Sequence, residues 1–228
     1  MNERKKILAR VHEALKVQAP MPGSHDNIHV PVSVLPLASG IRQWLPKVGE
    51  SFEEQLVLFQ NNAAELKANF QLIASRDELK TTLAKMSSAE NWKRIASHHG
   101  ELTDFVSGSL DVPICFTDKS YDVHELEACD VGISECDALV AQTGSVLVTN
   151  QSAGGRALSV LPPHHIVLAR REQFVADLPA AFELLKNKYA ANYPSMISFI
   201  TGPSRTGDIE RILVLGAHGP KRLTIFCL

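Results

Sequence analysis

The stretch SVLVTNQSAGGRALSVLPPHHIVLA, residues 145–169, carries the clearest signal for the fold. It holds two short apolar runs, at 145–149 and 165–169, separated by a segment that contains two glycines and two prolines. Short apolar runs without polar alternation are typical of strands that are buried on both faces. The stretch therefore predicts two such strands joined by a long loop, as in a sheet that helices cover on both sides.

Similar runs recur on both sides of this stretch. They are VPICF (112–116), MISFIT (196–201), RILVLG (211–216) and LTIFCL (223–228). A helix is predicted at 177–193, between two of the runs, as expected for a crossover that connects parallel strands. We therefore predict an α/β fold with a Rossmann-like, mainly parallel sheet and helices on both faces.

The segment before residue 110 is predicted to be mainly helical. Between Phe52 and Phe70, apolar residues recur at spacings of three and four, which is the pattern of a helix with one buried face. Ser51 and Glu54 form a capping-box pattern at its start. Two shorter helices are predicted to begin at the similar pairs Ser75…Glu78 and Ser87…Glu90, and QLIAS (71–75) is a candidate strand.

The N-terminal part of the chain differs from the rest. Residues 3–18 predict a helix with one narrow apolar stripe, which we expect to pack on its own domain or on a partner. Five prolines between residues 19 and 50 exclude a continuous helix and indicate an extended connector. We therefore divide the chain into an N-terminal helix with its proline-rich connector, residues 1–50, and an α/β domain, residues 51–228.

Composition limits the classes of function. The chain has 228 residues and a net charge of −2, and it shows no Lys/Arg-rich patch with interleaved aromatics, so nucleic-acid binding is not expected. Its four cysteines lack C-x-x-C spacing, so we expect no metal or iron–sulfur site on this chain alone. The charged N-terminus lacks a signal-peptide core, and residues 138–155 are too polar for a membrane span. We therefore expect a cytoplasmic protein.

Polar residues gather in three segments at the ends of predicted strands, where ligands bind in open α/β sheets. The segments are Thr143-Gly144-Ser145, the GGR run that ends at Arg156, and TGPSRTGD (201–208) with the GAHGP turn after it. Glycine allows close backbone approach, hydroxyls and free N–H groups can donate hydrogen bonds, and arginine suits a carboxylate or phosphate. We predict a pocket for a small anion lined by Thr143, Gly144, Ser145, Arg156, Ser204, Arg205, Thr206 and His218.

Simpler interpretations of the same residues stay open. The third segment could be a capped turn with Arg205 in solvent, and His218 could be a turn histidine without a role. Glu135, amid apolar residues, is a candidate base or nucleophile, and His218 is a candidate proton shuttle. Carboxylates in such positions are more often paired or cap a helix. The pair His164-His165 should point in opposite directions at the start of a strand. No convincing third ligand lies nearby in the sequence, so a metal site at this pair is not expected.

Three blocks of this sequence together resemble one family. They are DVGISECDALVAQTGSVLV (130–148), GGRALSVLPPHHIVLA (154–169) and FITGPSRTGDIERILVLGAHGPKRLTIFCL (199–228). In order and spacing they are similar to the lactate-utilization protein C family, also called the LUD domain or DUF162. The resemblance implies a fold similar to the sugar-phosphate isomerase and CoA-transferase superfamily. It also implies a role in oxidising L-lactate to pyruvate, beside partner proteins that carry iron–sulfur clusters.

Gln142 stands where many members of the family have an acid, so no catalytic carboxylate is expected at that position. The resemblance also implies a set of ligand-binding residues. The implied residues are Thr143, Gly144, Ser145, Arg156, Gly202, Pro203, Ser204, Arg205, Thr206, Asp208, His218 and Gly219. Three functions stay open: a lactate-oxidation subunit that binds a 2-hydroxy or 2-keto acid, a stand-alone acyl- or phospho-metabolite transferase or isomerase that uses Glu135 or His218, and a non-catalytic scaffold or regulatory subunit. A homo-oligomer is compatible with each of them.

Overall fold

The computed structural model describes residues 47–118, 120–206, 214–216 and 218–228, together with the single positions 9, 13 and 16. The predicted N-terminal helix and proline-rich connector therefore lie outside the described residues, apart from those three positions. The chain divides into two units, Met1–Leu45 and Pro46–Leu228. The elements below all belong to the second unit.

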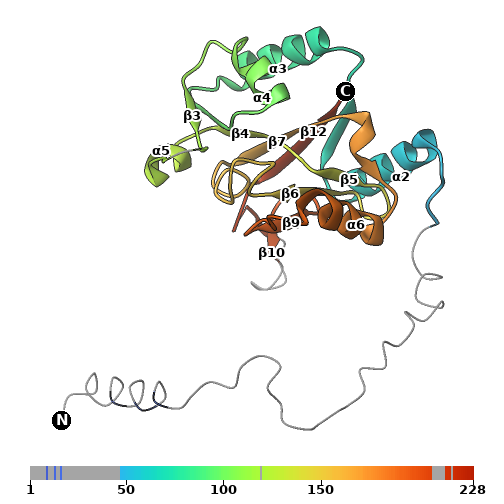
Figure 1. The fold of residues 1–228 in the computed structure, drawn as a ribbon. Helices are drawn as coiled ribbons and strands as arrows, with labels where there is room; N and C mark the ends of the chain where they lie inside the picture. The colour runs from blue at the N-terminus through green and yellow to red at the C-terminus, as the bar shows by residue number, and fades with distance from the viewer. Residues whose placement is uncertain are drawn as a thin grey trace. The chain divides into compact units, whose positions relative to one another are not determined.

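A six-stranded parallel sheet forms the centre of this unit (Figure 1). Its strands are β1 (Asn69–Leu72), β2 (Ile95–Ser97), β3 (Ile114–Phe116), β4 (Val131–Glu135), β7 (His164–Ala169) and β12 (Arg222–Cys227). They lie side by side in the order β1-β12-β7-β4-β2-β3, and every neighbouring pair is parallel. From β3 to β12 the order is that of a doubly wound sheet, 2-1-3-4-5, whose winding reverses between β2 and β4.

Two smaller sheets accompany the parallel one. The four-stranded sheet contains β5 (Ala138–Val140), β6 (Ser145–Thr149), β8 (Phe174–Val175) and β9 (Ile197–Ile200), and the two-stranded sheet contains β10 (Arg205–Thr206) and β11 (Val214–Leu215). Strand β6 runs antiparallel to both β5 and β9. The predicted mainly parallel sheet is confirmed, but the runs at 145–149 and 196–201 belong to the mixed second sheet. Strand β6 is buried throughout and β9, at the edge of that sheet, is half-buried, so a uniform apolar run does not report strand direction.

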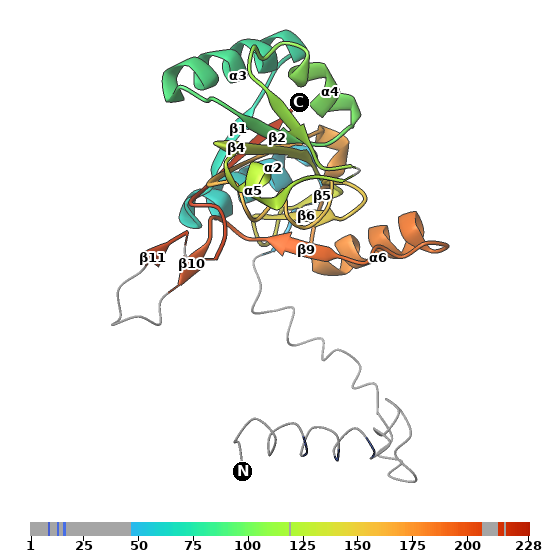
Figure 2. The same ribbon diagram turned by 90° about the vertical axis from the view of Figure 1, so that its left-hand side faces the viewer.

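The helices separate the sheets into layers. They are α2 (Phe52–Glu65), α3 (Arg76–Glu90), α4 (Glu101–Ser107), α5 (Val123–Glu127) and α6 (Leu178–Tyr189). Helices α3 and α4 pack on one face of the parallel sheet, where Leu79 meets Ile166. Helix α2 and the four-stranded sheet cover the other face, where Phe59 meets Val167, and α6 covers the outer face of the second sheet through Ala181. Figures 1 and 2 show the layers in this order.

The helix starts follow local capping chemistry. At α2, the Ser51 hydroxyl accepts the N–H of Glu54 at 3.2 Å, and the Glu54 carboxylate accepts the N–H of Ser51 at 3.2 Å, so the predicted capping box is confirmed. Ser75 caps α3 in the same way. The predicted helix start at Ser87…Glu90 is wrong, because these residues lie inside α3. No breaker precedes Ser87, so the helix continues until Asn91 takes a left-handed conformation.

The cysteines belong to two core clusters: Cys115 packs against the cluster that contains Cys129, and Cys136 and Cys227 share another. Cys129, Cys136 and Cys227 are buried and Cys115 is half-buried, and all four are free thiols. Burial raises the pKa of the Cys129 thiol to about 12 and that of Cys227 to about 12. These thiols are therefore protonated at neutral pH and pack as small apolar side chains.

Candidate functional site

A cavity of about 270 Å³ lies where three neighbouring parallel strands, β1, β12 and β7, begin. We call it the amino-edge pocket. Its lining residues are Lys67, Asn69, Met86, Glu90, His164, Pro203, Lys221, Arg222, Leu223 and Thr224. Its volume is close to the lower end of the range for small-molecule sites, about 300–1,000 Å³. The pocket therefore suits a small metabolite.

Lys67 reaches the pocket from the end of α2. Two hydrogen bonds close this helix end, from Ala68 N–H to the Ala63 carbonyl at 2.9 Å and from Lys67 N–H to the Ala64 carbonyl at 3.0 Å. This is the Schellman pattern, in which glycine is preferred at the position that Lys67 occupies. Lys67 has a φ of 66°, a left-handed conformation that costs a lysine about 1 kcal/mol. Such strain is often found at functional positions.

Lys221 reaches the pocket from the turn before β12. Its N–H donates to the Pro163 carbonyl at 2.8 Å, which joins the starts of β12 and β7. A Cβ added to Gly216 would lie 2.2 Å from Lys221 Cγ, so the lysine stem packs directly against this glycine. Among the described residues, neither Lys67 nor Lys221 has a carboxylate within ion-pair distance. Within this part of the chain, both ammonium groups are therefore open to a ligand.

The third cation of the pocket, Arg222, is already neutralised. Its guanidinium donates two hydrogen bonds to the Glu90 carboxylate, at 2.8 and 2.5 Å. The same carboxylate accepts the indole N–H of Trp92 at 2.9 Å. The hydrogen bond from Arg222 is the main cause that lowers the pKa of Glu90 to about 2. Glu90 is thus ionised at neutral pH and holds Arg222 in place.

His164 forms part of the floor of the pocket. Its Nδ1 lies 2.9 Å from an Arg222 nitrogen, and its Nε2 lies 2.9 Å from the Thr224 hydroxyl. A guanidinium can only donate, so Nδ1 accepts and Nε2–H donates to Thr224. Burial, helped by the charge of Arg222, lowers the pKa of His164 to about 4. The imidazole is therefore neutral at pH 7, although Nδ1 lies only 3.7 Å from the Glu90 carboxylate.

These groups define the chemistry of the amino-edge pocket. Two ammonium groups that have no ion-pair partner among the described residues stand beside a closed Glu90–Arg222 pair and a neutral imidazole. Apolar surface comes from Met86, Pro203 and Leu223. The pocket can neutralise a carboxylate or phosphate and can pack a short apolar tail, so it favours a small organic anion.

Two of the predicted segments meet along the end of α2. The Ser145 hydroxyl lies 2.8 Å from the Thr201 hydroxyl, which joins the turn before β6 to the end of β9. A Cβ on Gly144 would lie 2.8 Å from Asn62 Cβ, and one on Gly202 would lie 2.6 Å from the Leu66 carbonyl. Both glycines have positive φ, at 63° and 85°, so their conformation and their packing each require glycine.

Thr143 lies in the same turn and has a feature that points to a ligand. Its hydroxyl oxygen is buried and has no hydrogen-bond partner in the described structure. A buried unpaired hydroxyl costs about 1–3 kcal/mol, so a bound ligand or water would relieve it.

The third segment continues from Gly202 to the pocket wall. Pro203 lines the amino-edge pocket. Ser204 N–H donates to the Pro220 carbonyl at 2.9 Å, and a Cβ on Gly219 would lie 3.2 Å from Ser204 Cβ, so the two predicted turns touch. Arg205 and Thr206 form β10. The Arg205 side chain is exposed, as is His218, and Asp208 lies outside the described residues.

Arg156 lies at the opposite edge of the parallel sheet. Thr117, after β3, donates its hydroxyl hydrogen to the Gly154 carbonyl at 2.7 Å, and a Cβ on Gly154 would lie 2.4 Å from His98 Cβ, after β2. This loop thus covers the carboxyl ends of two parallel strands, and Arg156 is exposed two residues later. The structure therefore does not place Arg156 with the turns at the amino edge.

Glu135 also lies at the carboxyl edge, at the end of β4. One carboxylate oxygen accepts the N–H of Leu102 at 2.7 Å in the first turn of α4, and the other lies 3.3 Å from a nitrogen of Arg170. The Glu135 N–H donates to His98 Nε2 at 3.0 Å. Glu135 and His98 thus meet at the reversal between β2 and β4, where doubly wound sheets bind ligands. The carboxylate is engaged as a helix cap and ion-pair partner, and its proposed catalytic role stays a prediction.

The sequence analysis did not predict that Lys67, Lys221, Arg222 and His164 line this pocket. A signal was present for two of them, since Lys221 and Arg222 directly follow the GAHGP turn. Lys67 could not be found in this way, because only its left-handed backbone and its place at the helix end bring it to the pocket. Glu90 lies 132 residues from Arg222 in the sequence, and no local pattern predicts that pair.

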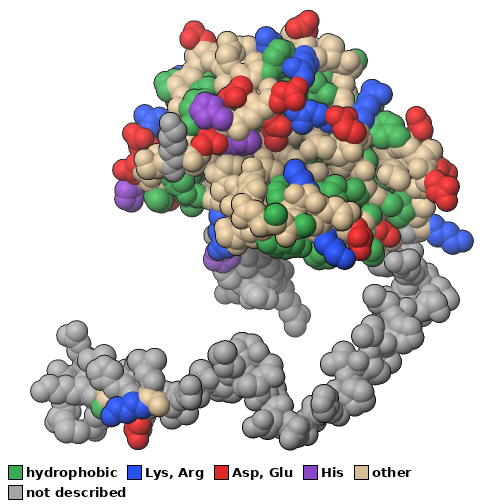
Figure 3. All heavy atoms as spheres, viewed as in Figure 1, with side chains coloured by type: hydrophobic (Ala, Val, Ile, Leu, Met, Phe, Trp, Pro, Cys, Tyr) green, Lys and Arg blue, Asp and Glu red, His purple; other side chains and the backbone are tan. Residues whose placement is uncertain are grey.

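One face of the molecule, drawn in Figure 3, is mixed in charge. Figure 3 shows Lys/Arg and Asp/Glu side chains interspersed on the face that it draws, without one large area of a single sign. None of the helices in the described part of the chain is long and apolar enough to cross a membrane.

Comparison with known proteins relates the sequence to one family. The family model of the LUD domain matches residues 56–228. Lactate utilization protein C 1 of Bacillus mycoides is 37% identical over 107 residues, which cover 46% of each chain. Lactate utilization protein C of Anoxybacillus flavithermus is 28% identical over 183 residues, which cover 77% of this chain and 81% of that one. Apart from that longer match, the chain spans a little under half the length of the curated relatives that it matches.

A solved structure shares the fold. A DUF162 family protein from Deinococcus radiodurans superposes with a TM-score of 0.61 at 21% identity, covering 78% of this chain and 99% of that one. The class is thus a Rossmann-like α/β domain with a parallel central sheet, a mixed second sheet and a small pocket at the amino ends of the strands. The chain belongs to the LUD domain family, as the three sequence blocks predicted.

Proposed function

We propose that this protein is a component of an L-lactate utilization system and binds a small organic anion, of the size of lactate or pyruvate, in the amino-edge pocket. The lactate role rests on the curated relatives, which are named lactate utilization protein C. The proposal of an anionic ligand rests on one observation: Lys67 and Lys221, which have no ion-pair partner among the described residues, line a cavity of about 270 Å³. The iron–sulfur clusters needed to accept electrons are proposed to reside on partner proteins, in keeping with the family resemblance.

A matched pair of ligands tests the binding step. We expect L-lactate and pyruvate to bind in isothermal titration, and lactamide, the uncharged analogue of lactate, to bind at least about tenfold more weakly because it lacks the carboxylate. Lys67→Ala and Lys221→Ala should each weaken lactate binding roughly 3- to 10-fold. Lys85→Ala is the control, because Lys85 is an exposed lysine of α3 outside the pocket.

The outcomes separate the alternatives. Equal binding of lactate and lactamide would contradict the anion proposal. Growth on L-lactate by a deletion strain, restored equally by the wild type and by the double Lys67/Lys221 variant, would favour the scaffold function over ligand binding. Turnover of acyl or phospho metabolites by the isolated chain, lost in Glu135→Gln, would favour the stand-alone enzyme.

A further inference from the structure

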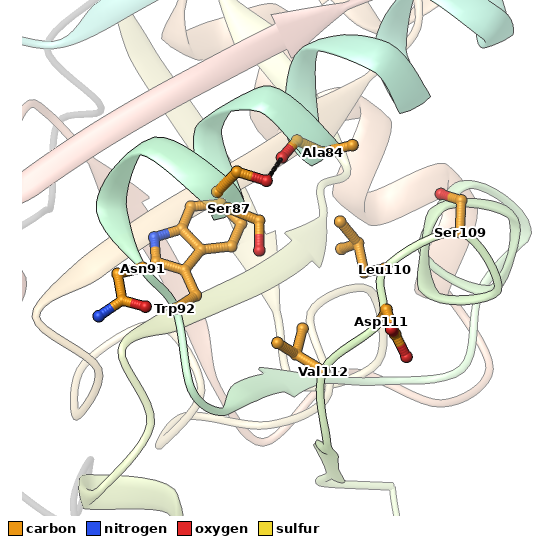
Figure 4. A pocket seen from close by; sticks show the side chains of 9 residues that line it. Ala84, Ser87, Asn91, Trp92, Ser109, Leu110, Asp111 and Val112 are labelled. Carbon is orange, nitrogen blue, oxygen red and sulfur yellow. Dashed lines mark hydrogen bonds between the residues drawn. The ribbon is translucent and has the colours of Figure 1, made fainter.

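A second cavity, of about 300 Å³, lies on the other side of the end of α3 (Figure 4). We call it the α3-end pocket. Ser87, Ser88, Asn91 and Trp92 form one wall, at the last turn of α3 and just after it. The segment after α4 forms the opposite wall, and Figure 4 shows its Leu110 and Val112 across the cavity from Trp92.

The charge of this pocket is opposite to that of the amino-edge pocket. Among the described residues that line it, Asp111 is the only ionisable one, and none is Lys, Arg or His. Asp111 is exposed and, within the described ranges, has no ion-pair partner. One cation lies beside the cavity without lining it, since Lys93 Nζ donates to the amide oxygen of the wall residue Asn91 at 2.6 Å. In the lining itself an anion would meet the Asp111 carboxylate, whereas an ammonium group would gain an ion pair with it.

The hydroxyl groups of the pocket favour a ligand that donates hydrogen bonds. Ser88 donates its hydroxyl hydrogen to the Ala84 carbonyl at 3.0 Å, and Ser109 donates to the Val106 carbonyl at 2.7 Å. With these hydrogens committed, each oxygen is left with lone pairs that can accept from a ligand. The Asn91 amide oxygen already accepts from Lys93 Nζ at 2.6 Å, so one of its two lone pairs is taken by a cation.

We propose that the α3-end pocket binds a small organic cation that carries hydroxyl groups, with an amino alcohol as the simplest example. Its ammonium group pairs with Asp111, its O–H and N–H groups donate to Ser88 and Ser109, and its carbon chain packs on Leu110 and Val112. Trp92 lines the pocket and donates its indole N–H to Glu90. Its fluorescence should therefore change when a ligand binds. This inference does not rest on the proposed function in lactate utilization.

Tryptophan fluorescence tests the proposal. Because Trp44 and Trp92 are the two tryptophans of the sequence, the variant Trp44→Phe reports on Trp92 alone. Three two-carbon probes of similar size differ in charge: ethanolamine, ethylene glycol and glycolate. We expect a saturable fluorescence change with ethanolamine at about millimolar concentration, as its few atoms allow, and no saturable change with glycolate. Ligand-observed saturation-transfer NMR with the full-length chain measures the same binding independently.

Two variants complete the test. Asp111→Asn should weaken ethanolamine binding about tenfold, since it removes the charge and keeps the shape. Asp77→Asn is the matched control, because Asp77 is exposed at the start of α3, away from the pocket. Absence of ethanolamine binding by both methods, equal binding of glycolate, or equal losses in the two variants would each overturn the proposal. A loss in Asp111→Asn alone, with binding ordered by charge, supports it.

Discussion

The two pockets on either side of the end of α3 are similar in size, about 270 and 300 Å³, but opposite in charge. The amino-edge pocket collects Lys67, Lys221 and Arg222 from the ends of separate elements, because parallel strands bring distant segments to one edge. The α3-end pocket uses two short segments of the chain, at 84–92 and 109–112. The cations of the amino-edge pocket therefore come together through the order of the strands. The hydroxyl groups and the carboxylate of the α3-end pocket come from residues that are close together in the sequence.

One side chain keeps the two pockets distinct. The Glu90 carboxylate accepts hydrogen bonds from Arg222 and from the Trp92 indole N–H, so its negative charge is neutralised on the amino-edge side. Trp92 itself lines the other pocket. The comparison of the two pockets indicates that the charge of the preferred ligand depends on which lining cations lack an ion-pair partner in the described structure. The total number of lining cations matters less, because Arg222 is already paired with Glu90. The predictions below test this difference through ligand binding and through the free energy of unfolding.

The largest effect is expected for Gly202→Ala. Its φ of 85° strains any other residue, and the new Cβ would lie 2.6 Å from the Leu66 carbonyl, so the Pro203 wall must move away from α2. We expect a loss of about 3 kcal/mol in the free energy of unfolding and loss of lactate binding, with ethanolamine binding retained. Urea unfolding and the two titrations measure these effects.

Gly155→Ala is the control for that variant. Its φ is 97°, yet a Cβ there would meet nothing within 4 Å, so only backbone strain of about 1 kcal/mol is expected. If both alanine variants lost the same stability, the contact of Gly202 with α2 would not matter and the described wall would be incorrect.

Acid should destabilise the amino-edge side of the molecule. The pKa of His164 is lowered from 6.5 to about 4, so the unfolded chain binds a proton at a higher pH than the folded one. The contribution of the neutral imidazole is therefore complete above pH 6.5 and is lost as pH falls toward 4, by up to about 3 kcal/mol. Unfolding free energies at several pH values should show this fall, and His164→Gln should reduce it. His124→Gln, at an exposed position of α5, should not.

Much of the fold was predictable because its signals are local. The capping box of α2 involves neighbouring residues, and the buried strands appear as uninterrupted apolar runs. The division into two sheets was not predictable, because β6 and β7 are both short and completely buried, although one is antiparallel and the other parallel to its neighbours. Partner choice among such strands depends on packing across the whole unit.

The candidate site was predictable only in part, for a related reason. Glycines with required conformations, such as Gly144 and Gly202, are visible in the sequence because few other residues fit those turns. The cations could not be predicted, because the sequence around Lys67 and Lys221 does not distinguish them from other surface lysines. Only the order of the strands brings them to the same pocket. Arg156 looked equally suitable, but the loop that carries it lies at the other edge of the sheet.

Glu90→Gln should increase the difference in charge between the two pockets, because it removes a negative charge from the amino-edge pocket. Glutamine keeps an oxygen for the Trp92 N–H but no longer neutralises Arg222, so a third cation becomes available to the anion. We expect lactate affinity to rise roughly 3- to 10-fold, while ethanolamine affinity changes less than about twofold. Titration of both ligands measures this. An unchanged lactate affinity would mean that the anion does not approach Arg222.

The smallest effect is expected for Asn91→Gly. Asn91 has a φ of 55° after the end of α3, a conformation that glycine adopts without strain, but glycine also gives the unfolded chain more freedom. These effects oppose each other, so the free energy of unfolding should change by less than about 0.5 kcal/mol. Ethanolamine affinity should change less than about twofold, because Lys93 already engages the Asn91 amide oxygen. A tenfold loss would instead place Asn91 among the groups that hold the cation, and would move the ligand from Asp111 toward the helix end.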